Sequence, residues 1–324
     1  DRVWFVNSGS EAVEAAIKMA RQFFLERDGL TSSKHLIIGR QNSYHGSSLG
    51  TLSIGGSTPR RKLYLPMFKD NPKIETHYCY RCPYGLTKPD CEIACARDLE
   101  KLILRTGPQY IAAFIAEPIG GSTVGALVPP DEYWPIVREI CTRYDILLIA
   151  DEVMSGCGRT GKNFCVDHWN VIPDLIATAK GLASCYYPVG AVIVSRSIGE
   201  VFHSGSGIFA HSHTFNGMPA ASAAIVAVLE YIKKHKLVEN AARMGQIIEK
   251  ELAPQLSENA IVGEVRGKGL MWGFELVSEK TAKTPFPVEV AASAKFKALC
   301  QKKMMTVYPG KGMVNGVLGD NVMV

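Results

Sequence analysis

Short apolar segments alternate with amphipathic helical segments along residues 1–200, and this alternation limits the fold more than any other feature of the chain. The pattern predicts an α/β fold, in which helices cover both faces of a mostly parallel sheet. The expected strands are Val3–Val6, His35–Gly39, Ile74–Tyr78, Ile111–Ala116, Ile146–Ala150, Leu175–Thr178 and Ala191–Ser195. The expected helices between them are Glu11–Arg27, Cys91–Thr106 and Asp131–Tyr144. Too few residues separate the sixth and seventh strands for a helical crossover, so we expect the seventh strand to be antiparallel.

The pattern changes after Asn216, where longer helices and then a second, smaller set of strands are expected. We therefore predict a large domain over residues 1–254 and a smaller α+β domain over residues 255–324. The expected elements are helices Pro219–Lys234 and Leu237–Leu256, strands Ile261–Val265 and Met271–Leu276, and a helix over Val288–Lys303. Residues 1–6 and 321–324 both read as strands that stop abruptly, so we expect a segment of a longer protein.

The composition excludes several classes of protein. Hydrophobic residues make up 47% of the 324 residues and charged residues 21%, which is enough apolar material for a large core. The net charge of +5 is spread along the chain without a Lys/Arg block, which argues against nucleic-acid binding. No apolar run approaches the roughly 20 residues of a membrane span. Nine cysteines in a chain of this length indicate free thiols and a cytoplasmic protein.

Ser8, Gly9, Ser10 and Glu11 lie between the first strand and the first helix. Ser8 and Glu11 have the spacing of a capping box. The N–H groups of Gly9 and Ser10 then fall in the first helical turn, where they lack helical acceptors and favour an anion. The alternative is an ordinary helix N-terminus without a ligand.

Asp151 and Lys180 each follow an expected strand, at the edge where open α/β sheets bind ligands. Asp151 could pair with a cationic ring nitrogen, or could only cap a helix. Lys180 is flanked by small and apolar residues, and a desolvated lysine becomes nucleophilic near neutral pH. The alternative is a surface lysine. Tyr44 lies in the long loop 41–59, where an aromatic ring could stack on a planar ligand or simply anchor the loop.

Together these motifs resemble the class III (ornithine/ω-amino acid) aminotransferases, which have fold type I and use pyridoxal 5'-phosphate (PLP). The similar segments run over the whole chain: NSGSEAVEAAIKMAR, YHG, AFIAEPIGG, LLIADEVMSGCGRTGK, PDLIATAKG, PVGAV, HTFNGMPAA and VRGKGLMWGFEL. The resemblance implies that Lys180 holds PLP as a Schiff base and shuttles the substrate proton. Asp151 would pair with the pyridine nitrogen, while Val153 and Tyr44 would cover the two faces of the ring.

The resemblance also implies a homodimer with its active site at the subunit interface. Gly9 and Ser10 would hold the cofactor phosphate, and His213 and Thr214 of the neighbouring subunit would add further phosphate contacts. Three residues would support the site: Glu117, His45 and, as an ion-pair anchor, Arg159. The implied reaction moves an amino group from an amino donor to a keto acid.

Two departures from the family bear on the substrate. Members acting on ornithine or γ-aminobutyrate often carry Gln at the position of Met154, and often carry Glu at the position of Ser122. The absence of that Glu favours ω-amino acids or amines with pyruvate or glyoxylate, and a diaminopelargonate-type enzyme is the alternative. A PLP aminomutase, racemase, decarboxylase or non-catalytic relative would carry similar cofactor residues. The family's carboxylate-binding arginine is expected beyond Val324.

One motif lies outside the resemblance. Cys79, Cys82, Cys91 and Cys95 have a spacing that a tetrahedral zinc site could accept. Two closely spaced cysteine pairs without histidine fit zinc only on a suitably folded loop. We therefore expect free thiols and no metal.

Overall fold

A computed structural model describes residues 2–324 and contains two sheets. The larger has seven strands in the order β1-β7-β6-β5-β4-β2-β3. Only β7 runs against its neighbours β1 and β6, which confirms the mostly parallel sheet with one antiparallel strand. The strands are β1 (Arg2–Val6), β2 (Leu36–Arg40), β3 (Lys73–Ile74), β4 (Ile111–Ala116), β5 (Leu147–Asp151), β6 (Leu175–Thr178) and β7 (Gly190–Val194).

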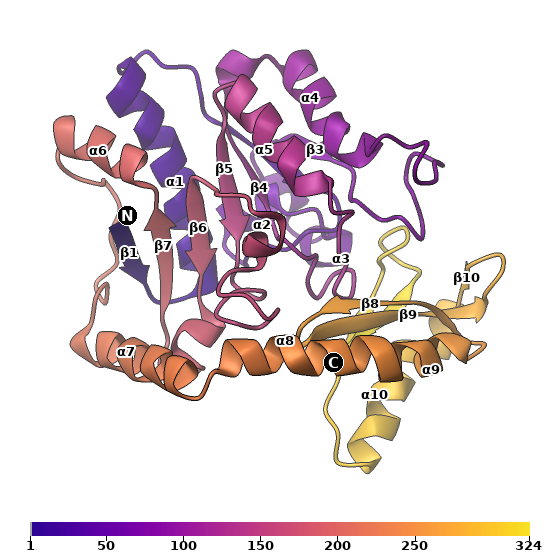
Figure 1. Ribbon diagram of the computed structural model, residues 1–324. Helices are drawn as coiled ribbons and strands as arrows, with labels where there is room; N and C mark the ends of the chain where they lie inside the picture. Colours follow the sequence, from indigo (N-terminus) through magenta and orange to yellow (C-terminus); the bar gives the residue numbers. More distant parts are fainter. Residues whose placement is uncertain (1) are drawn as a thin grey trace.

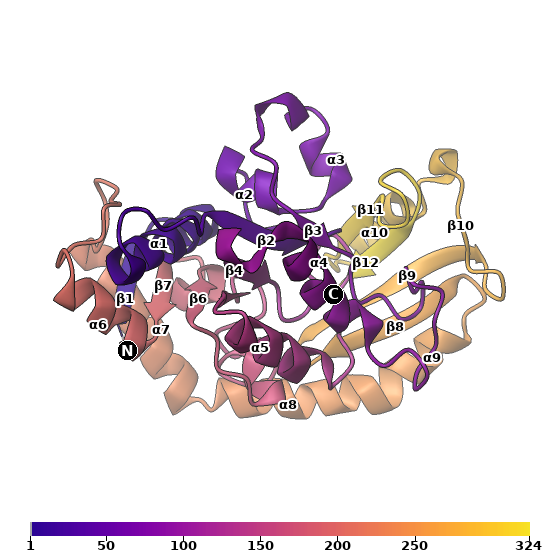
Figure 2. The same ribbon diagram turned by 90° about the horizontal axis from the view of Figure 1, so that it is seen from above.

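Helices cover both faces of this sheet (Figures 1 and 2). In β4, Ile115 faces the side packed by α1 (Gly9–Asp28), whereas Phe114 faces the side packed by α4 (Ala94–Thr106) and α5 (Tyr133–Arg143). Successive side chains of a strand point to opposite faces, so a strand buried on both sides must be continuously apolar. The sequence Ile111–Ala116 meets this requirement, and every residue in it is buried.

The capping box expected at the start of α1 is only half formed. Ser8 Oγ accepts the N–H of Glu11, as expected for an N-cap residue. The Glu11 carboxylate instead accepts the N–H of Asn7, one residue before the cap, at 2.7 Å. The reason is that Glu11 also accepts from the Asn7 side-chain amide, so its carboxylate lies over Asn7 rather than over Ser8.

The second sheet contains β8 (Val262–Lys268), β9 (Met271–Glu279), β10 (Thr284–Pro285), β11 (Tyr308–Lys311) and β12 (Asp320–Met323). Its core includes Phe274, Leu276 and Val322, against which α10 (Ala292–Lys302) packs. The helix expected over 288–303 is interrupted, because Ala291 adopts a left-handed conformation between a 3-10 turn and α10. The strand expected over 74–78 is shorter and begins one residue earlier, as the two-residue β3, and residues 75–78 lie outside it.

A long helical segment joins the two sheets (Figure 1). After α7 (Pro219–Lys234), α8 (Leu237–Ile247) continues through a π-helical turn into α9 (Ala253–Glu258). Residue 254, the expected domain boundary, lies within this continuous helix, so the division into residues 1–254 and 255–324 stays a prediction. No helix among residues 2–324 is both long enough and apolar enough to cross a membrane.

Candidate functional site

The carboxyl ends of the parallel strands point toward α8 and the second sheet (Figure 1). At this edge lies a cavity of about 450 Å³. Loops that follow five different strands bring residues to it, as expected for a ligand site in an open α/β sheet. Its lining includes Gly9 and Ser10 after β1, Tyr44 and His45 after β2, Glu117 after β4, Asp151 and Val153 at the end of β5, and Lys180 after β6.

Asp151 is a buried carboxylate whose two oxygens are both held. Its Oδ2 accepts a hydrogen bond from His45 Nδ1 at 2.7 Å, and its Oδ1 accepts the Val153 N–H at 3.1 Å. The Asp151 residue is 4% exposed and His45 is 3% exposed. A buried charge requires such partners, and they fix the direction in which the carboxylate faces the cavity.

Lys180 opens a 3-10 turn directly after β6 and has a positive φ of 45°. Non-glycine residues in the left-handed region are uncommon and gather at functional sites. Of the two alternatives for Lys180, desolvated or at the surface, the second describes this chain, because the side chain is exposed. The exposure arises because Lys180 lies between the first cavity and a second, more open one of about 890 Å³.

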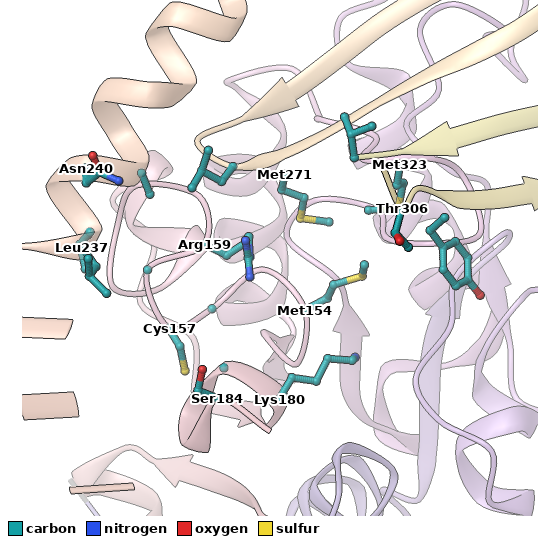
Figure 3. A pocket seen from close by; sticks show the side chains of 18 of the residues that line it. Met154, Cys157, Arg159, Lys180, Ser184, Leu237, Asn240, Met271, Thr306 and Met323 are labelled. Atoms are coloured by element: carbon teal, nitrogen blue, oxygen red, sulfur yellow. The ribbon is translucent and has the colours of Figure 1, made fainter. Parts of the chain in front are cut away.

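The second cavity lies between the large-sheet loops and the second sheet (Figure 3). Met154, Lys180 and Arg159 reach it from the loops after β5 and β6, opposite Met271 and Met323. Arg159 forms no salt bridge within residues 2–324, so its expected role as an ion-pair anchor stays a prediction.

The start of α1 forms the opposite wall of the first cavity. The N–H groups of Gly9 and Ser10 make no hydrogen bond to any residue in 2–324, so they are available to an anion. Glycine at position 9 leaves room for Val153, since an added Cβ would lie 2.7 Å from Val153 Cγ1 and one of the two would have to shift.

Glu117 links two loops under the cavity. Its carboxylate accepts the N–H of Tyr44 at 3.3 Å and the N–H of Gly121 at 3.1 Å. Burial raises the pKa of the Glu117 carboxyl, and the neighbouring His45 partly offsets this effect. Arg40 donates to the Glu117 carbonyl at 2.6 Å and so joins the loop to β2. These contacts fit the expected role of Glu117, which is to hold the loops under the cavity in place.

His213 and Thr214 do not line the first cavity within this chain. His213 Nε2 lies 3.9 Å from Glu11 Oε2, and Thr214 is exposed. Sequence reasoning missed two residues that do line the cavity, Arg60 and Tyr308. Neither lies in a motif or at the end of a long strand, so the sequence offers no signal for them.

Comparison with known proteins decides the family. The family model described as "Aminotransferase class-III" matches residues 1–323. The chain belongs to the class-III aminotransferases. It is 38% identical to the uncharacterized aminotransferase YodT of Bacillus subtilis, over 99% of this chain and 72% of the relative. It is 37% identical to the mitochondrial gamma-aminobutyrate transaminase 1 of Oryza sativa, over 99% of this chain and 61% of the relative.

Solved transaminase structures share the fold. An amine transaminase from an uncultivated Pseudomonas species, solved in the PLP-bound form, superposes with a TM-score of 0.91 at 35% identity, covering 100% of this chain and 71% of that one. An (S)-enantioselective omega-transaminase from Thermomicrobium roseum has a TM-score of 0.90 at 36% identity, covering 99% and 69%. The fold is therefore that of the fold type I transaminases, and the cofactor is PLP.

The residues at the first cavity fit PLP. The free N–H groups of Gly9 and Ser10 suit a phosphate. The fixed carboxylate of Asp151 suits a protonated ring nitrogen, and Lys180 offers an amine at the same cavity. Tyr44 and Val153 provide an aromatic and an aliphatic surface for the ring.

Proposed function

We propose that this enzyme transfers an amino group from an ω-amino acid or amine to a keto acid such as pyruvate or glyoxylate. The observation that supports this most is the convergence of Lys180, Asp151 and the free N–H groups of Gly9 and Ser10 on one cavity. PLP, when bound, supplies an electron-withdrawing ring that stabilises negative charge on the substrate carbon.

The chain's own residues would have separate tasks. Lys180 Nζ would hold the cofactor covalently and then, once free, accept and return the substrate proton as general base and acid. Asp151 would keep the ring nitrogen protonated, and His45 would keep Asp151 oriented through their 2.7 Å hydrogen bond. Gly9 and Ser10 would bind the phosphate, and Tyr44 and Val153 would enclose the ring.

The assembly and location are part of the proposal. His213 and Thr214 lie away from the cavity of their own chain, which is compatible with their serving a partner in a homodimer. Sedimentation analysis of the PLP-loaded protein would test this, and a monomer would contradict it. The nine cysteines are free, which accords with a reducing compartment such as the cytoplasm.

The decisive experiment is a pair of half-reactions. Adding β-alanine or a simple amine to the PLP-loaded chain should remove the visible absorption of the PLP form and release a carbonyl product. Adding pyruvate or glyoxylate afterwards should restore the absorption. Release of carbon dioxide without a keto product would indicate a decarboxylase, and loss of substrate chirality or migration of its amino group would indicate a racemase or an aminomutase.

A further inference from the structure

An arginine that sequence reasoning missed faces the candidate cofactor cavity. Arg60 lies on the short helix α3 (Thr58–Arg61) and lines the same cavity as Lys180 and Asp151. Its guanidinium carbon lies 4.1 Å from the centre of the Tyr44 ring. Its Nη2 donates to the hydroxyls of Ser122 at 3.2 Å and Tyr308 at 3.1 Å. Arg60 is therefore held at the cavity by neutral groups.

The charge of Arg60 has no counterion within the described part of the chain. None of the salt bridges among residues 2–324 includes Arg60, although the arginines at 27, 81, 138, 143 and 266 all pair with carboxylates. The adjacent Arg61 is engaged differently, since it donates to the carbonyls of Leu52 and Ser53. A half-buried guanidinium without a counterion favours an anionic ligand.

The unused N–H groups of Arg60 are available to an anion. Nη2 donates to two hydroxyls, whereas Nε and Nη1 make no hydrogen bond within residues 2–324. These two nitrogens lie on different edges of the guanidinium, so a carboxylate here would accept a hydrogen bond from one of them and pair with the positive charge. The cofactor phosphate already has its site at the N–H groups of Gly9 and Ser10, so the anion at Arg60 is a separate one.

The residue at position 122 leaves the charge of Arg60 free to bind an anion, because Ser122 is neutral. A carboxylate at that position, within reach of Nη2, would neutralise the guanidinium. The Ser122 hydroxyl keeps the 3.2 Å contact without adding a negative charge.

We propose that Arg60 binds the carboxylate of the amino-acid or keto-acid substrate and so favours carboxylate-bearing substrates over simple amines. The inference rests on the proposed transamination. It assigns specificity to a residue more than 260 positions before the region where the family's carboxylate-binding arginine is expected.

The test compares donors that differ only in the carboxylate. Half-reaction rates are measured for L-alanine against isopropylamine and for 4-aminobutyrate against butylamine, using PLP-loaded wild type and Arg60→Met. The kcat/KM ratio of carboxylate donor to amine should fall about 10- to 100-fold in at least one pair, as expected for a lost hydrogen-bonded charge. Arg60→Lys should fall between the two, because lysine keeps the charge but lacks the rigid planar group that directs the N–H donors of arginine.

A binding measurement tests the assignment of Arg60 without requiring the enzyme to turn over a substrate. Calorimetric titration with butyrate, which has no amino group to transfer, should give a Kd about 10-fold or more higher for Arg60→Met than for wild type. Arg105→Met, which removes an exposed arginine from the last turn of α4, should change neither the donor ratios nor this Kd. Thermal unfolding of each variant checks that it folds.

Different results would contradict the assignment of Arg60 and the proposed transamination. Unchanged donor ratios and unchanged butyrate affinity in a folded Arg60→Met variant would overturn the assignment of Arg60 and leave transamination intact. Weaker PLP binding with unchanged donor ratios would overturn it in favour of a phosphate role. A wild type that converts neither these four donors nor β-alanine would contradict the proposed function. The butyrate titration would still test the assignment of Arg60 in that case.

Discussion

His45 Nδ1 lies 2.7 Å from Asp151 Oδ2, and both side chains are buried under the candidate PLP cavity. The second carboxylate oxygen is held by the Val153 N–H. The hydrogen bonds from His45 and Val153 therefore fix the orientation in which the Asp151 carboxylate faces the cavity. Both partners belong to the same chain as Asp151. This arrangement suits a group whose task is to hold a positive charge at one point.

Replacing Asp151 by Asn should lower turnover about 100-fold or more, the size typical of removing one electrostatic group from an active site. The neutral amide cannot keep the ring nitrogen protonated, whereas the phosphate contacts of Gly9 and Ser10 remain, so part of the PLP binding should persist. PLP content and half-reaction rates measure the two effects. Asp131→Asn, at an exposed aspartate, serves as the control. Near-normal turnover would mean that Asp151 is only structural.

Lys180→Ala should still bind PLP but lose the proton transfer, which corresponds to about 100- to 10,000-fold in rate. Borohydride reduction of the wild type followed by peptide mapping should find the pyridoxyl mass on Lys180. Lys162→Ala, at an exposed lysine in the loop after β5, should behave like wild type. A pyridoxyl mass on another lysine would refute the assignment.

The large sheet could be predicted from the sequence because its strands are buried on both faces. Ile111–Ala116 and Leu147–Asp151 leave no exposed position, so their apolar runs are unbroken. Asp151 and Lys180 could be found for the same reason, since each is a polar residue at the end of such a run. Arg60 and Tyr308 could not, because they come from a four-residue helix and a short strand that meet only in three dimensions.

The sequence left open whether Lys180 is desolvated or exposed. Its neighbours in sequence are small and apolar, and Ala179 and Leu182 are indeed buried. The turn that begins at Lys180 reverses the chain, so the side chain points into the cavities rather than into the core packed by its neighbours.

Glu152 should make stability depend on pH. Burial raises the pKa of its carboxyl from 4.5 to about 7. The native state therefore binds this proton more tightly than the unfolded state, so the Glu152 contribution to stability falls as pH rises from about 4.5 to about 7 and is constant above that. At 1.36 kcal/mol per pKa unit, the full loss is about 3 kcal/mol.

Glu152→Gln should remove this dependence. The amide can still accept the Val166 N–H and can donate to the Ser155 hydroxyl, which replaces the hydrogen bonds of the carboxylate. The variant should be more stable than wild type by up to about 3 kcal/mol at pH 8 and similar to it near pH 4.5. Urea unfolding across this range measures the difference, with exposed Glu258→Gln as the control. A difference that does not vary with pH would contradict the prediction.

Gly9→Ala should weaken PLP binding without abolishing folding. The added methyl group would lie 2.7 Å from Val153 Cγ1, so the first turn of α1 must shift and its N–H groups with it. We expect the Kd for PLP to rise about 10-fold, equivalent to the loss of one good hydrogen bond to a charged group. Gly9→Ala combined with Val153→Ala should recover part of the affinity. Unchanged PLP binding in the single variant would argue against a phosphate site at this helix.

The four cysteines at 79, 82, 91 and 95 should hold no metal. All four line one cavity of about 130 Å³, yet no group of three or more ligating side chains in residues 2–324 has an arrangement that could hold a metal ion. Metal ligation needs thiolates. Burial raises the pKa of the Cys95 thiol to about 12, so without a metal ion this thiol is protonated near neutral pH and zinc would have to displace its proton. Elemental analysis of protein purified without chelator should therefore find well below one zinc per chain, and Cys82→Ser should leave thermal stability nearly unchanged. About one zinc per chain, lost in Cys82→Ser together with stability, would mean that the loop closes around a metal that these side-chain positions do not accommodate.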